Sequence, residues 1–211
     1  IPVCDELDVK MAIHPDDPPW DIFSLPRIIC TEEDLDKLFD AVKSKNNGVT
    51  FCTGSLGARR DNDLVRMADK YSKMGRIHFV HLRNVCWVED NYSFYESGHY
   101  SQDGSLPINE IVKVLVKNNF DGFVRPDHGR NIFGEDKKPG YGLYDRALGC
   151  AYITGLFEAF EDKENKKRNM TMQLHFAVTR NVNKLAFKKC GVDSGFDITS
   201  TQANIKNIIM F

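Results

Sequence analysis

Two short stretches decide how this chain is organised: VRPDHGR at residues 124–130 and PGYGLYDR at residues 139–146. The first predicts a strand that ends in a polar loop carrying Asp127 and His128. The second brings Tyr141 to the position just before an apolar helix. Together they predict a strand–loop–helix unit whose polar side chains lie at the carboxyl end of the strand.

The same order of strand, polar loop and helix occurs three more times before this unit. The earlier strands are predicted to end at His14, Cys52 and His81. Consecutive units of this kind are typical of a parallel sheet with crossover helices. Since the carboxyl ends of such strands meet at one edge, these three side chains and Asp127 could close around one metal ion.

The helices between these strands have regular start signals and apolar faces. A helix over residues 31–45 is predicted from the cap residue Thr31. Further helices are predicted from about 61 to 75 and from Pro107, while residues 91–104 are predicted to form a long polar and aromatic loop. The face of the first helix that we expect to be buried consists of Leu35, Leu38, Phe39 and Val42.

The predicted fold class is α/β, and the alternation fits either a (β/α)8 TIM barrel or a doubly wound open sheet. No glycine-rich phosphate-binding fingerprint follows the first strand, so the barrel is favoured. About four βα units make only half a barrel, and a half leaves two strand edges open. We therefore expect either that a first half precedes Ile1 in a larger protein or that a partner completes the barrel.

Composition excludes several broad classes of function. The chain has 211 residues, 42% of them hydrophobic and 27% charged, with a net charge of −2. This balance predicts neither a nucleic-acid nor a membrane partner, and no apolar run is long enough to span a bilayer. The irregular spacing of the six cysteines favours free thiols over a disulfide framework, which predicts a cytoplasmic protein.

The character of the sequence changes near residue 161. Residues 1–160 are predicted to form the partial catalytic barrel, and a charged segment begins the remainder, 161–211. That remainder lacks the strand–helix period and is rich in Asn, Lys and Ile. Two readings stay open for it: a small genuine appendage, or a reading frame translated past its proper end.

Five motifs occur in a fixed order along the first 160 residues: HPDDPP at 14–19, LPRII at 25–29, HLRN at 81–84, RPDHGR at 125–130 and PGYGLYDRA at 139–147. Together they resemble the D-mannonate dehydratase family, which the resemblance implies to be a hydro-lyase of hexuronate breakdown with a metal-dependent barrel of the xylose-isomerase-like type. The matching part is similar to the C-terminal half of that family.

The resemblance implies a ligand set and a reaction. It implies Mn²⁺ or Fe²⁺, whereas the mixed imidazole and thiolate set alone would place zinc first. The implied reaction is dehydration of D-mannonate to 2-keto-3-deoxy-D-gluconate, with His128 and Tyr141 as the acid–base pair. We favour Tyr141 as base and His128 as acid, but the sequence leaves the direction open. The implied metal ligands are His14, Cys52, His81 and Asp127.

Removing the C2 proton places a second negative charge on the substrate carboxylate, and the C3 hydroxyl needs a proton to leave; a cation, a base and an acid meet these needs. Arg83 is predicted to bind the substrate carboxylate bidentately, and His99 to be a lid or substrate contact.

The partners expected are a small sugar acid and, at full length, further copies of the same chain. The alternatives are a sugar isomerase or epimerase of the xylose-isomerase type, or an inactive truncated remnant.

Overall fold

The computed structural model describes residues 1–90, 92–167, 178–179 and 198–199. The chain divides into two compact units, Ile1–Lys167 and Arg168–Phe211. The described part of the second unit is one antiparallel pair, β7 (Val178–Thr179) with β8 (Ile198–Thr199). Of the predicted tail, 161–211, residues 168–177, 180–197 and 200–211 fall outside the described residues.

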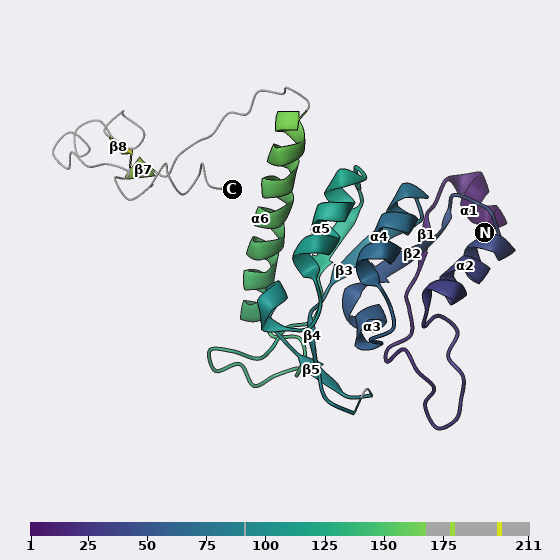
Figure 1. Cartoon of the computed structure of the whole chain (residues 1–211), viewed down its shortest axis with the longest axis horizontal. Helices are drawn as coiled ribbons and strands as arrows, with labels where there is room; N and C mark the ends of the chain where they lie inside the picture. Colours follow the sequence, from purple (N-terminus) through teal and green to yellow (C-terminus); the bar gives the residue numbers. More distant parts are fainter. Residues whose placement is uncertain (91, 168–177, 180–197, 200–211) are drawn as a thin grey trace. The chain divides into compact units, whose positions relative to one another are not determined.

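The first unit is built on a four-stranded parallel sheet in the order β1-β2-β3-β6 (Figure 1). Neighbours in the sheet are also neighbours in the order of the predicted units, which confirms an α/β fold with a parallel sheet. The outer strands β1 and β6 have no further strand paired with them among the described residues. The four strands are β1 (Met11–Ile13), β2 (Asn47–Cys52), β3 (Ile77–Leu82) and β6 (Phe123–Pro126).

The register of the sheet places the candidate site in one row. Cys52 pairs with His81, and His81 pairs in turn with Arg125. Because directly paired residues of parallel strands project to the same face, these three side chains share the face that carries the site. Phe51 and Val80 alternate with them, project to the other face and are fully buried there.

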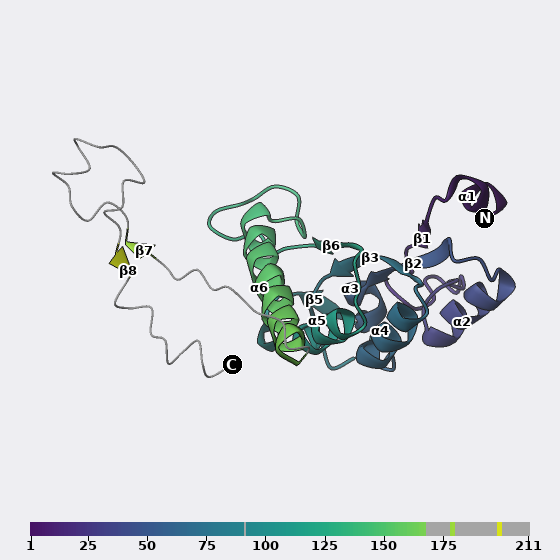
Figure 2. The ribbon, with the colours of Figure 1, turned by 90° about the horizontal axis from the view of Figure 1, so that it is seen from above.

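Helices cover that other face of the sheet (Figure 2). Helix α5 packs against both α4 and α6, and α6 also contacts β6. Apolar positions at helical spacing bury Met67, Ala68 and Tyr71 on α4, and Ile111 and Leu115 on α5. The helices are α2 (Glu32–Ala41), α4 (Leu64–Lys73), α5 (Ile108–Lys117) and α6 (Leu143–Lys167).

Helix α2 begins as predicted and ends early. Thr31 and Asp34 form a reciprocal capping box at its first turn. The helix stops at Ala41 instead of continuing to residue 45, and Val42 is extended and exposed rather than buried. The side-chain amide of Asn47 donates to the backbone carbonyls of Leu38 and Val42, which satisfies acceptors at this end.

Several elements were not predicted. A hairpin, β4 (Val85–Trp87) with β5 (Phe94–Glu96), begins before and enters the segment predicted to be a loop, and a 3₁₀ turn, η1, covers Ser101–Asp103. Helix α6 continues through Lys167, so the charged segment after residue 160 is helical at its start. Two short helices were also missed, α1 (Pro2–Leu7) and α3 (Thr53–Ala58). None of the described helices is long and apolar enough to cross a membrane.

Candidate metal and acid–base site

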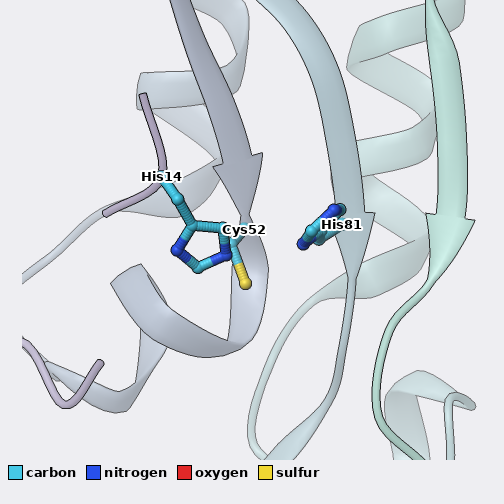
Figure 3. A group of neighbouring side chains, drawn as sticks. All are labelled: His14, Cys52 and His81. Atoms are coloured by element: carbon cyan, nitrogen blue, oxygen red, sulfur yellow. The ribbon is translucent and has the colours of Figure 1, made fainter. Parts of the chain in front are cut away.

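Three of the predicted ligands converge where β1, β2 and β3 end (Figure 3). The side chains of His14, Cys52 and His81 point toward one another, and one donor atom from each lies within 4.8 Å of the others. His14 directly follows β1, Cys52 is the last residue of β2, and His81 is the penultimate residue of β3. The predicted strand ends therefore deliver these donors to one place.

Asp127 joins this cluster from the end of β6. Its Oδ2 lies 3.7 Å from His81 Nδ1 and 3.9 Å from Cys52 Sγ. Its other oxygen, Oδ1, accepts a hydrogen bond from the Arg125 guanidinium. Asp127 is only 3% exposed, and Arg125 supplies a positive charge at its outer side. The carboxylate is thus oriented with one oxygen toward His81 and Cys52.

The polar atoms of His81 fit the role of a metal ligand. The residue is 8% exposed, and both ring nitrogens are buried without a hydrogen-bond partner in the structure. Buried polar groups are nearly always paired, so two unpaired nitrogens on one ring indicate a missing partner. Burial lowers the pKa of His81 to about 4, which keeps the imidazole neutral and able to coordinate.

Cys52 and His14 offer the other two donors. Burial raises the pKa of the Cys52 thiol to about 11, even though Ser55 donates a hydrogen bond to the sulfur at 3.1 Å. A thiolate at this position therefore needs a cation beside it. His14 Nδ1 lies 2.7 Å from the carbonyl oxygen of Pro15, so Nδ1 carries the proton and Nε2 keeps its lone pair. Together with His81 and Asp127 these donors fit a divalent transition metal.

The predicted acid–base pair lies beside Asp127. His128 Nε2 is 3.8 Å from Asp127 Oδ2, and the ring centroids of His128 and Tyr141 are 4.8 Å apart. His128 has a backbone φ of 55°, in the left-handed region that non-glycine residues adopt uncommonly. Tyr141 is 45% exposed, so its phenol is accessible.

Two backbone hydrogen bonds close the base of the loop between β6 and α6 and bring Tyr141 back to His128. We call this closure, formed by Gly129, Gly140 and Gly142, the neck. The Gly129 amide donates to the Gly140 carbonyl, and the Gly142 amide donates to the Gly129 carbonyl, both at 3.0 Å. A Cβ on Gly142 would lie 1.9 Å from the carbonyl oxygen of Arg130, so only glycine fits. Asp145, at the start of α6, fixes the same segment by accepting from the backbone amide and the guanidinium of Arg130.

Arg83 is not free to take the predicted role. Its guanidinium is 4% exposed and donates to both oxygens of Glu96 and, at 2.6 Å, to Asp17 Oδ2. Two protein carboxylates thus occupy the positions predicted for a substrate carboxylate. We therefore leave Arg83 out of the proposed substrate contacts.

His99 lies inside the protein instead of in a lid. It is 4% exposed, and its Nε2 lies 3.3 Å from the backbone carbonyl of Asp127. A Cβ on Gly149 would meet the His99 ring at 2.3 Å, so the ring packs closely against α6. Burial lowers the pKa of His99. This position supports the backbone behind Asp127 and offers no direct approach to a substrate.

Sequence reasoning missed Glu96 and Asp17 as parts of the site. Glu96 Oε1 lies 2.9 Å from His128 Nδ1, and Asp17 reaches the site only through Arg83. Glu96 sits on the unpredicted strand β5, and a carboxylate in a loop carries no signal of its own. The motif HPDDPP, which holds Asp17 three residues after His14, was the available hint.

The parallel sheet carries His14, Cys52, His81 and Asp127 at the carboxyl ends of its strands. The chain is therefore an α/β protein with a candidate metal centre. Comparison identifies the family: the chain belongs to the D-mannonate dehydratase (UxuA) family, whose profile matches residues 1–168. The mannonate dehydratase of Thermotoga maritima is 54% identical over 167 residues, and that of Geobacillus thermodenitrificans 51%. Each match covers 79% of this chain but only 46% and 45% of those proteins, so the chain spans about half of their length.

Solved structures agree with this assignment. The mannonate dehydratase from Streptococcus suis serotype 2 has a TM-score of 0.74 and 44% identity, over 82% of this chain and 48% of that one. A D-tagatose 3-epimerase-like protein has a TM-score of 0.54 and 16% identity, over 77% and 52% of the two chains, which shows a shared fold only. A second profile, that of glucuronate isomerase, matches residues 132–211.

Proposed function

We propose that this chain carries the metal-binding and acid–base half of a mannonate dehydratase, a hydro-lyase that converts D-mannonate to 2-keto-3-deoxy-D-gluconate and water. The supporting observation is the convergence of His14, Cys52 and His81, with Asp127 Oδ2 3.7 Å from His81 and 3.9 Å from Cys52, beside His128. Family membership supports the same reaction. The activity is a proposal because the chain spans about half of its relatives.

The fold proposal follows from the same comparison. We propose that the four-stranded sheet is the C-terminal half of a (β/α)8 barrel of the xylose-isomerase-like type. The open outer edges of β1 and β6 support this, since a closed barrel would pair both. Phe123 on β6 is 82% exposed, as expected for a side chain that another part of a barrel would cover.

The metal proposed is Mn²⁺ or Fe²⁺, held by His14, Cys52, His81 and Asp127. When bound, it would supply positive charge to offset the negative charge that develops on the substrate carboxylate after C2 loses its proton. Asp127, oriented by Arg125, supplies the carboxylate ligand that suits these ions. The neutral His81 supplies a nitrogen that no protein group already occupies.

Tyr141 and His128 are proposed to move the two protons of the reaction. Tyr141 would take the C2 proton, and His128 would protonate the C3 hydroxyl so that it departs as water; the resulting enol becomes the ketone. The facing rings, 4.8 Å apart, allow both to reach one small substrate. Because Glu96 faces His128 Nδ1, Nε2 is the nitrogen that can exchange a proton with the substrate.

A small sugar acid is thus the proposed substrate. We further propose a cytoplasmic location and self-association at full length. The free cysteines among the described residues, Cys4, Cys30, Cys52, Cys86 and Cys150, support the location. These proposals concern the intact enzyme, for which the exposed edges of the sheet would be covered.

The experiment is incubation of D-mannonate with Mn²⁺ and the chain, alone or mixed with the N-terminal half of the Thermotoga maritima relative. We expect little turnover by the chain alone and formation of a 2-keto-3-deoxy acid by the mixture. Formation of an isomeric sugar would instead support an isomerase. Absence of both metal binding and a cooperative unfolding transition would support an inactive remnant and contradict the proposal.

A further inference from the structure

A continuous series of charged side chains runs from Asp17 through Arg83 and Glu96 to His128. Asp17 Oδ2 accepts from Arg83 Nη1 at 2.6 Å. Arg83 Nη2 and Nε donate to the two oxygens of Glu96 at 2.5 and 3.0 Å. Glu96 Oε1 then faces His128 Nδ1 at 2.9 Å. The series joins the β1–α2 loop, the end of β3, the hairpin and the loop after β6.

Arg83, at the centre of the series, is held on every side. Its backbone amide donates to Thr53 Oγ1 at 2.8 Å, and its guanidinium lies over the Phe94 ring at 5.4 Å. Gly54 leaves space for it, since a Cβ there would lie 2.2 Å from Arg83 Cδ. A bidentate pair with a buried, immobile guanidinium fixes the plane of the Glu96 carboxylate.

The charges show why this series differs from an ordinary ion pair. Two carboxylates and one guanidinium carry a net charge of −1, and Glu96 is the carboxylate that also faces His128. Burial alone would raise the pKa of Glu96, but hydrogen bonds from His128 and Arg83 lower it, so Glu96 is a carboxylate and can only accept. An acceptor opposite Nδ1 requires that the proton of a neutral His128 ring lie on Nδ1.

We propose that Glu96 is a positioning residue that keeps a proton on His128 Nδ1 and that Arg83 and Asp17 fix Glu96 for this purpose. The protonated ring then gives its Nε2 proton to the departing hydroxyl, and the neutral ring left behind is the Nδ1–H tautomer. The proposal rests on the proposed function for the role of His128. It assigns Arg83 to orientation of the acid–base pair in place of substrate binding. Its structural basis, the geometry of the series, does not depend on a bound metal.

The test is the tautomer of His128 in the full chain, measured by long-range ¹H–¹⁵N correlation of ¹⁵N-histidine-labelled protein. Measurements are made at a pH where the ring is neutral, and His128→Asn assigns the signals. We expect wild type to show a proton on Nδ1 and none on Nε2. Glu96→Asp keeps the charge that Arg83 needs but shortens the reach to His128, so we expect loss of the single tautomer. Glu89→Asp, at an exposed glutamate in the segment between β4 and β5, is the matched control.

Two results would overturn the proposal: an Nε2–H tautomer in wild type, which needs no variant to fold, or an unchanged Nδ1–H tautomer in Glu96→Asp. In the reconstituted enzyme, Glu96→Asp should lower kcat about 10- to 100-fold with little change in KM, as for other residues that orient a functional histidine. A raised KM with unchanged kcat would count against positioning. Failure of dehydration by wild type would refute the proposed function but leave the tautomer measurement standing.

Discussion

Replacing His81 with leucine should change how the stability of the metal-free chain depends on pH. The ring is 8% exposed, and burial lowers its pKa to about 4, whereas an unfolded chain has a histidine pKa near 6.5. Between these values the unfolded state binds more protons than the folded state. Stability is therefore lost as the pH falls from about 6.5 toward about 4.

The size of the effect follows from the shift. At about pH 5 the unfolded ring is almost fully protonated and the folded ring is almost neutral, so His81 should cost wild type about 2 kcal/mol relative to pH 7.5. His81→Leu has no such term. At pH 7.5 the variant should be about 1 kcal/mol more stable than wild type, because it removes two buried nitrogens that have no partner.

The assay is urea unfolding of EDTA-treated wild type and His81→Leu at the two pH values. Titrating groups that do not interact with His81 affect both proteins alike, so the comparison is the difference between the two losses. Wild type should lose about 2 kcal/mol more than the variant between pH 7.5 and pH 5. Equal losses would show that His81 is not buried as a neutral ring, and the argument for a vacant ligand nitrogen would fail with it.

Three further predictions test the surroundings of the site. Mn²⁺ at about 100 times its dissociation constant should stabilise wild type by about 2.7 kcal/mol, and Cys52→Ala should remove most of this gain. Both effects are measured from the midpoint of thermal unfolding, and an equal gain in the two proteins would contradict the ligand set. Gly142→Ala should open the neck, because the new Cβ would lie 1.9 Å from the backbone oxygen of Arg130. Limited proteolysis within residues 130–141 should then become faster, while β3 stays protected from hydrogen exchange. Asp145→Asn should lower the free energy of unfolding by about 1–3 kcal/mol, since it weakens a buried acceptor of Arg130; no change in urea unfolding would show the pair to be dispensable.

The sheet was accessible to sequence reasoning because each strand carries a short apolar run and ends in a polar residue. His14, Cys52, His81 and Asp127 were predicted at strand ends, and parallel pairing alone brings such ends together. The hairpin β4–β5 was missed because its strands are three residues long and its turn is polar. The end of α2 was placed four residues too late, at residue 45 instead of Ala41. The groups that satisfy this end are close by in sequence: the Asn47 side chain donates to the carbonyls of Leu38 and Val42, a contact that the residue pattern alone does not reveal.

The sequence did not reveal the surroundings of Arg83 and His99, because their contacts join residues that are far apart along the chain. Arg83 beside His81 looked like a free guanidinium because its partners, Asp17 and Glu96, are separated from it along the chain. His99 looked like an exposed loop residue because its burial depends on α6 packing over it at Gly149. Local pattern thus predicted which residues gather at the edge, whereas the choice of ionic partners required three-dimensional contacts.

The neck formed by Gly129, Gly140 and Gly142 joins the two ends of the loop between β6 and α6. His128 and Tyr141 flank the neck, and its hydrogen bonds help to set their spacing. The outer loop contributes as well, because Lys138 accepts from the Tyr141 amide and Glu135 accepts from the Leu143 amide. A change in the outer loop that keeps these two contacts should therefore leave His128 and Tyr141 in place. In an engineered chain, that segment would be the place to vary the surroundings of the site without rebuilding the site itself.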